Sequence, residues 1–140
     1  MVLTFLADAN IQGHVDRLVG RMQQEPWGEF WAHLQLSYVQ FGDVGLDPAD
    51  SDAVVWKRCQ DKGLLLLTNN RNADGPDSLE ATIREHNSFE KLPVFTIGDA
   101  DRALWDDHYS DTVIWTLVDY LLRIDDLGGT GRLYLPARAP

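Results

Sequence analysis

The architecture follows from one segment of the chain, Leu64-Leu65-Leu66-Leu67-Thr68-Asn69-Asn70. Its four consecutive leucines lie between a predicted helix and a run of polar residues. A short apolar run bounded in this way is typical of a strand buried on both faces, as the strands of a parallel sheet are. We therefore expect a parallel sheet in which Thr68, Asn69 and Asn70 lie at the carboxyl end of an inner strand.

Strands and helices alternate on both sides of this segment. Further strands are predicted at residues 2–7, 36–41, 93–97 and 132–135. Helices are predicted at about 13–22, 26–34, 52–62 and 78–86, with a last apolar stripe over 113–122. The alternation predicts an α/β fold, an open three-layer sandwich with a central, mostly parallel sheet of four to five strands.

Length and composition indicate one domain. The chain has 140 residues and is 44% hydrophobic, which suits a single core. We expect a domain over residues 1–136 and a tail over 137–140. The apolar runs fall short of the ~18 residues of a membrane span. The first apolar run is short and soon followed by an acidic residue, which does not suit a signal peptide, so we expect a cytoplasmic protein. The single cysteine, Cys59, excludes an intrachain disulfide and is expected to pack in the core.

The net charge limits the classes of partner. Twelve Lys and Arg against 22 Asp and Glu give −10, and 17 of those acids are Asp. Such a balance excludes a generally basic nucleic-acid surface, because phosphate neutralisation needs cations in excess. The net charge remains compatible with an acidic metal site or with a protein partner. Asp, with its shorter stem, holds its oxygens closer to the backbone than Glu does.

Short polar side chains collect where the predicted strands end. In open α/β sheets ligands bind beyond the carboxyl ends of the strands, and clusters of oxygen ligands there suit Mg²⁺ or Mn²⁺. Asp and Asn also cap helices and form turns, and the spacing of Asp77 and Glu80 is that of a capping box. Asp8 follows a strand with no cap position apparent after it, which favours a site role. The strand-end residues are Asp8, Asn10, Asp47, Asp50, Asp52, Asn69, Asn70, Asn72, Asp74, Asp77, Asp99 and Asp101.

Three segments together resemble one family. Residues 6–11, Leu-Ala-Asp-Ala-Asn-Ile, resemble the opening motif of the PIN-like proteins, the toxin-type branch of the PIN-domain nuclease superfamily. Ser51-Asp52 before a helix is similar to the second motif of that branch, and residues 65–72, Leu-Leu-Leu-Thr-Asn-Asn-Arg-Asn, to the third. Order and spacing agree over about residues 3–100.

The resemblance implies metal-dependent cleavage of RNA phosphodiesters, with Mg²⁺ or Mn²⁺ in an acidic pocket. It matches Asp8 to the first acid and Asp52 to the second, while Asn70 and Asn72 occupy positions where the family has aspartates. Asp74, Asp77 or Glu80 is expected to supply the missing negative charge. Asn70 and Asp77 are further catalytic candidates. The residues expected to contact substrate are Asn10, Asn69, Arg71 and Asn72.

Three functions stay open on the sequence alone. The first is a PIN-like ribonuclease, as the toxin of a toxin–antitoxin pair with an antitoxin-like partner. The second is a catalytically weakened PIN-like protein that binds a protein partner or forms a homodimer, favoured by the two Asn replacements. The third is phosphoryl transfer through Asp8, since Asp8-Ala9-Asn10 distantly resembles the Asp-x-Asp motif of haloacid-dehalogenase-type phosphatases. Such enzymes need a late lysine, and the last lysine here is Lys91.

Overall fold

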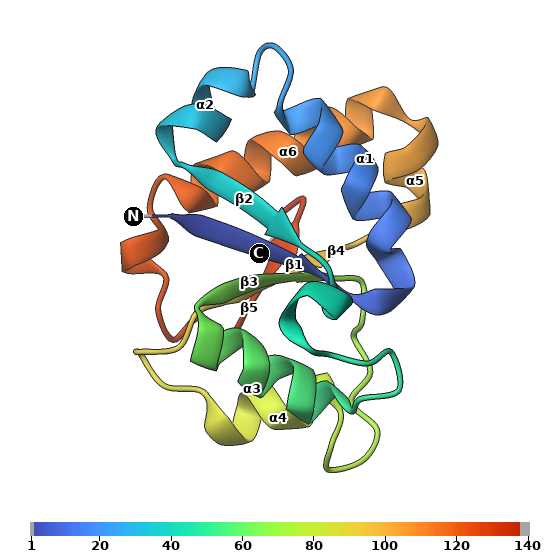
Figure 1. The fold of residues 1–140 in the computed structure, drawn as a ribbon, viewed down its shortest axis with the longest axis vertical. Coiled ribbons are helices and arrows are strands. Elements are labelled where there is room, and N and C mark those ends of the chain that lie inside the picture. Colours follow the sequence, from blue (N-terminus) through green and yellow to red (C-terminus); the bar gives the residue numbers. More distant parts are fainter. Residues whose placement is uncertain (1, 138–140) are drawn as a thin grey trace.

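A five-stranded sheet forms the centre of the molecule, in a computed structural model that describes residues 2–137 (Figure 1). All pairings between neighbouring strands are parallel, and the spatial order is β2-β1-β3-β4-β5. The predicted parallel α/β sheet is thereby confirmed. The strands are β1 (Leu3–Ala7), β2 (Leu36–Val39), β3 (Leu64–Thr68), β4 (Val94–Ile97) and β5 (Arg132–Leu135).

Helices cover both faces of this sheet. In Figure 1, α1, α2, α5 and α6 lie on one side, and α3 and α4 lie on the other. The bounds are α1 (Gln12–Met22), α2 (Gly28–His33), α3 (Asp52–Lys62), α4 (Leu79–His86), α5 (Ala100–Trp105) and α6 (Asp107–Leu121), with 3₁₀ turns η1 (Ala9–Ile11), η2 (Phe41–Val44) and η3 (Ile124–Asp126).

The four leucines of β3 alternate between two hydrophobic clusters. Leu65 and Leu67 pack in the cluster beneath α1 and α6, whereas Leu64 and Leu66 pack in the cluster beneath α3. Every residue of β3 is buried. A fully buried leucine contributes roughly 1.5–3 kcal/mol to stability. Because its leucines pack against both helical layers, β3 is held in place, and so is the start of the polar segment Thr68 to Asn70 that follows it.

Three helices, α4, α5 and α6, differ from the elements that the sequence predicts. Helix α5 was missed, because six residues are too few to display a helical period; Asp99 caps it by accepting a hydrogen bond from the Arg102 N–H at 3.0 Å. Helix α6 begins at Asp107, six residues before the apolar stripe, where Asp106 caps it. The predicted capping box at Asp77 is wrong, since Ser78 is the N-cap of α4.

Most of the predicted tail, residues 137–140, lies outside the described residues. Within residues 2–137, no helix combines the length and the apolar character that a bilayer span requires.

Candidate functional site

The winding of the sheet reverses between β1 and β3. From β1 the chain passes outward to β2, then crosses back to β3 and continues through β4 to β5. The loops that leave β1 and β3 therefore turn to opposite faces and separate, and a crevice opens beyond the strand ends. An open pocket of about 510 Å³ lies there. It brings together seven of the predicted site residues: Asp8, Asn10, Asp52, Asn69, Asn70, Arg71 and Asn72.

Asp8 stands directly at the end of β1. One carboxylate oxygen accepts the Ala9 N–H at 2.8 Å, and the other accepts the Thr68 hydroxyl at 2.6 Å. Asp8 thus does cap η1, contrary to the expectation that no cap position follows it. Burial raises the pKa of Asp8 above its ordinary value, against the opposing effect of these two hydrogen bonds, and the charge of Asp52 raises it further.

Asp52 approaches the pocket from the first turn of α3. Its neighbour Ser51 is the N-cap of that helix and accepts the Val54 N–H at 3.3 Å. One Asp52 oxygen accepts two hydrogen bonds, from the Asn70 side-chain amide at 2.9 Å and from the Leu79 N–H at 3.1 Å. Asp52 therefore joins α3 to the loop after β3 and to the start of α4.

The asparagines after β3 hold one another and the loop. The Asn70 amide oxygen accepts the Asn72 N–H at 2.8 Å, and the Asn72 amide oxygen accepts the Asp74 N–H at 3.0 Å. Across the pocket, the Asn10 amide donates to the Asn69 amide oxygen at 3.1 Å. An aspartate at position 70 could not donate to Asp52, so Asn70 replaces a carboxylate repulsion with a hydrogen bond.

The other three predicted ligands lie apart from this pocket. Asp74 and Asp77 line an adjoining hollow of about 350 Å³, which shares Asp52 and Asn72 with the pocket. Glu80 faces away and pairs with Arg132, with 2.9 Å between the Glu80 carboxylate and Arg132 Nη2. The structure therefore brings two carboxylates, Asp8 and Asp52, to the pocket itself.

The pocket is lined by carboxylate and amide oxygens, donors of the kind that a hard divalent cation takes. Among residues 2–137, the structure has no group of three His, Cys, Asp or Glu side chains that could hold a metal ion. Mg²⁺, however, is commonly bound through one or two carboxylates, with water and substrate phosphate completing its shell. Asp8 and Asp52 supply that number, and amide oxygens such as that of Asn10 are suitable further donors.

Two site residues were missed by sequence reasoning. The Thr68 hydroxyl donates to Asp8 and accepts the Asn70 N–H at 2.9 Å, so it joins the ends of β1 and β3. The signal for Thr68 was a hydroxyl directly after the four leucines. Arg132, at the start of β5, contacts the Asn70 carbonyl, and the sequence carries no signal for it because the two residues lie far apart along the chain.

Cys59 is buried, which confirms the expected packing role. Burial and the charge of Asp8 raise the pKa of its thiol to about 12.

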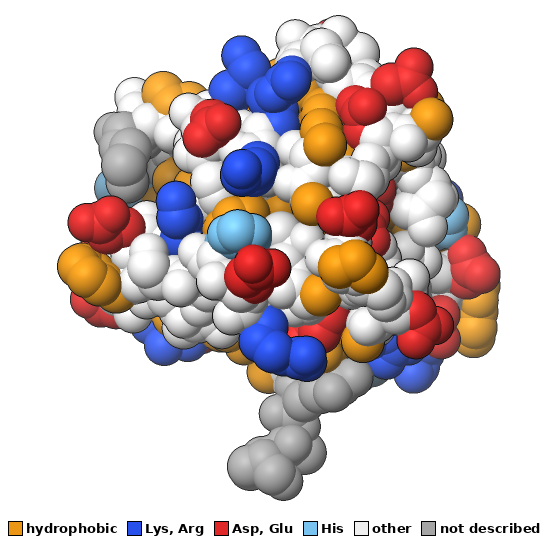
Figure 2. All heavy atoms as spheres, turned by 90° about the horizontal axis from the view of Figure 1, so that it is seen from below, with side chains coloured by type: hydrophobic (Ala, Val, Ile, Leu, Met, Phe, Trp, Pro, Cys, Tyr) orange, Lys and Arg blue, Asp and Glu red, His pale blue; other side chains and the backbone are white. Residues whose placement is uncertain are grey.

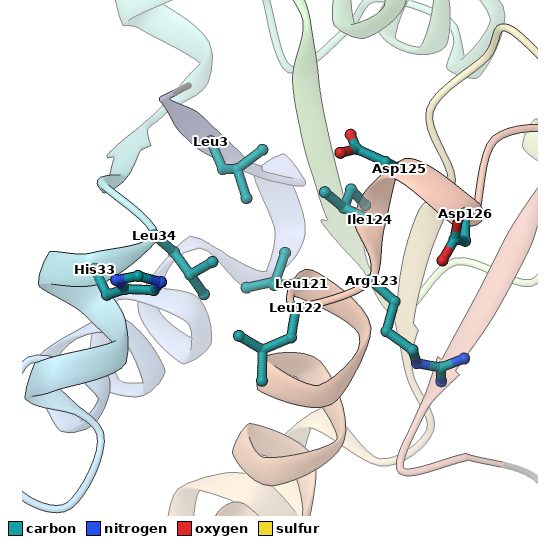
Figure 3. Close-up of a pocket in the computed structure, with 9 residues that line it drawn as sticks. All are labelled: Leu3, His33, Leu34, Leu121, Leu122, Arg123, Ile124, Asp125 and Asp126. Carbon is teal, nitrogen blue, oxygen red and sulfur yellow. The ribbon is translucent and has the colours of Figure 1, made fainter.

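A second hollow lies at the opposite, amino edge of the sheet (Figure 3). It measures about 410 Å³, and leucines from β1, the end of α2 and α6 gather in it. Its one arginine, Arg123, points away from the leucines and donates to Asp119 at 3.0 Å. Beside these leucines the hollow is lined by His33, Asp125 and Asp126, so it combines apolar and polar contacts.

The face formed by α3 and α4 carries charges of both signs. Figure 2, which views the molecule from this side, shows Lys and Arg side chains interspersed with Asp and Glu and no continuous basic patch. A nucleic acid would find scattered cations on this face. Arg71 is an exposed cation that lines the pocket.

Comparisons with models of protein families, with curated proteins and with solved structures gave no match.

Proposed function

We propose that the pocket beyond β1 and β3 binds Mg²⁺ or Mn²⁺ and hydrolyses RNA phosphodiester bonds, as the PIN-like resemblance implies. One observation carries the proposal: Asp8 and Asp52, from segments far apart in the sequence, line one open pocket with Asn10, Asn69 and Asn70. Helix caps and turns account for a carboxylate at each position separately. They do not account for the convergence of both on the edge where α/β sheets bind ligands.

Each residue has a distinct task in this proposal. Asp8 and Asp52 hold the ion, which when bound supplies Lewis-acid activation of water and neutralises charge on the phosphate. Thr68 and Asn70 orient the two carboxylates through the 2.6 Å and 2.9 Å hydrogen bonds already described. Arg71, exposed at the rim, binds a substrate phosphate and so orients the RNA strand.

The second candidate is a binding module with a weakened pocket. It is favoured by the donor that Asn70 directs at Asp52, because this contact satisfies the carboxylate without a cation. In that case a protein partner, such as an antitoxin-like protein or a second copy of the chain, would carry the function. Metal binding separates the two candidates, since a binding module has no need of it.

The nuclease proposal is tested by cleavage of single-stranded RNA with Mn²⁺, using wild type, Asp8→Asn and Asp52→Asn. We expect each variant to lose more than about 100-fold in rate, since even residues that only support metal ligands cost 10–100-fold. Asp61→Asn is the matched control, because Asp61 is exposed on the same helix as Asp52. Cleavage that survives in Asp8→Asn and Asp52→Asn would contradict the proposal.

A further inference from the structure

Arg132 is a buried cation behind the candidate pocket. It is the first residue of β5, and its side chain is 6% exposed. Its Nη1 donates to the Asn70 carbonyl at 2.7 Å and to the Thr96 hydroxyl at 2.6 Å. Its Nε and Nη2 donate to the Glu80 carboxylate at 3.1 and 2.9 Å. The guanidinium thus has two separate sets of contacts, one directed to the loop after β3 and one to α4.

Asn70 is the link between Arg132 and the pocket. Its N–H is held by Thr68, its carbonyl by Arg132, and its side-chain amide donates to Asp52. With both backbone groups fixed, the direction of the Asn70 side chain is restricted. Loss of the contact at the carbonyl would free the peptide group that follows Asn70, and with it the geometry of the amide relative to Asp52.

Stability alone is a poor account of this arrangement. A buried ion pair commonly contributes no more than apolar residues of similar volume, because desolvation offsets the attraction. An arginine that binds only Glu80 would not need to reach a backbone carbonyl two strands away, beyond β4. The planar guanidinium can hold both groups at once with fixed geometry, which a lysine ammonium cannot.

We infer that Arg132 is a positioning residue for the pocket: it fixes Asn70 so that the Asn70 amide meets Asp52, and Glu80 serves as its counter-ion. Any consequence for metal binding or RNA cleavage rests on the proposed function. The positioning itself does not, because it concerns contacts within the protein.

Two variants separate the two sets of contacts. Glu80→Gln removes the charge of the counter-ion and leaves the contact with the Asn70 carbonyl. The double variant Arg132→Met with Glu80→Gln removes the guanidinium and leaves no unpaired charge.

The readout is amide hydrogen exchange of the full chain. The Leu79 N–H reports on Asp52, the Asn70 N–H reports on the loop, and the Ala9 N–H, bonded to Asp8, is the internal control. We expect exchange at Asn70 and Leu79 to accelerate about tenfold or more in the double variant, with little change at Ala9. In Glu80→Gln we expect neither amide to change. Equal acceleration at all three amides, or none in the double variant, would overturn the inference.

A titration with Mn²⁺ alone then separates this inference from the proposed function. If wild type binds Mn²⁺, the double variant should bind it about tenfold more weakly, as expected when a residue that supports metal ligands is removed. Glu80→Gln should bind Mn²⁺ as tightly as wild type. Equal Mn²⁺ affinity in wild type and the double variant would overturn a role of Arg132 in metal binding. If wild type binds no Mn²⁺, the proposed function fails, and the exchange result alone decides the inference.

Discussion

Asp52 and Glu80 are both acids at the start of a helix, yet they have opposite surroundings. Asp52 opens onto a pocket, and within residues 2–137 the bonds it accepts come from neutral groups, the Asn70 amide and the Leu79 N–H. Glu80 is paired with the buried cation Arg132. Asn70 lies between them, with its side chain on Asp52 and its carbonyl on Arg132. An acid that accepts bonds from neutral donors keeps an uncompensated negative charge, whereas the charge of an acid paired with arginine is already balanced.

The largest effect is expected on the Glu80 side of this comparison. Arg132→Met leaves the Glu80 carboxylate and the Asn70 carbonyl without their donor, and we expect the free energy of unfolding to fall by about 3 kcal/mol. Glu80→Gln keeps an acceptor for the guanidinium but leaves the buried cation without its counter-ion, so we expect a smaller loss of about 2 kcal/mol. Urea unfolding of the two variants checks both values. Equal losses would contradict the claim that the guanidinium holds two separate groups.

The next effect is expected on the Asp52 side. Asn70→Asp places a second carboxylate where the amide now donates, so without metal we expect a loss of about 1–2 kcal/mol in unfolding free energy at neutral pH. Added Mn²⁺ should recover part of it, because a further negative charge strengthens a cation site.

Asn72→Asp is the control for Asn70→Asp. Asn72 is exposed, and its side chain accepts a backbone N–H that an aspartate accepts equally well. We expect Asn72→Asp to change the unfolding free energy by less than about 0.5 kcal/mol. Similar destabilisation by both variants, or no response of Asn70→Asp to Mn²⁺, would place position 70 outside the cation site.

The pH dependence of Asp8 gives a smaller effect with a definite sign. Its pKa is raised in the folded protein above the ordinary 3.8, chiefly by burial. The folded state therefore binds the Asp8 proton more tightly than the unfolded state does, and the stability from this group is lost as pH rises through the folded pKa.

Asp8→Asn removes that dependence. We expect the variant to gain stability relative to wild type as pH rises from 3.8 through the raised pKa of Asp8, measured by urea unfolding at a series of pH values without metal. Asp61→Asn, which alters an exposed acid, serves as the control. A difference between Asp8→Asn and wild type that is constant with pH would show that burial of Asp8 has no energetic effect.

The fold could be predicted because its signals are local. The leucines of β3 mark a strand buried on both faces, and Ser51 and Gly63 mark the two ends of α3, where Gly63 has a φ of +67°. The sequence does not predict the short helix α5, because its six residues carry no complete helical period and its cap, Asp99, also fits the end of a strand. Local patterns thus predict long elements better than short ones.

The site could be predicted only in part. Strand ends indicated Asp8 and Asn70, since parallel strands finish at the same edge of a sheet. The sequence could not show which of the later acids faces the pocket, because this depends on the direction of α4 and on distant partners. Glu80 faces Arg132, which lies more than 50 positions further along the chain. Charge alone could not distinguish an acid that faces a pocket from one that neutralises a buried arginine.

A cation site formed by Asp8 and Asp52 can be tested by calorimetric titration with Mn²⁺ of wild type, Asp8→Asn, Asp52→Asn and the control Asp61→Asn. We predict one Mn²⁺ per chain in wild type and Asp61→Asn, and an affinity lowered more than about tenfold in Asp8→Asn and Asp52→Asn. Absence of Mn²⁺ binding by wild type, or equal binding by all four proteins, would contradict a cation site formed by Asp8 and Asp52.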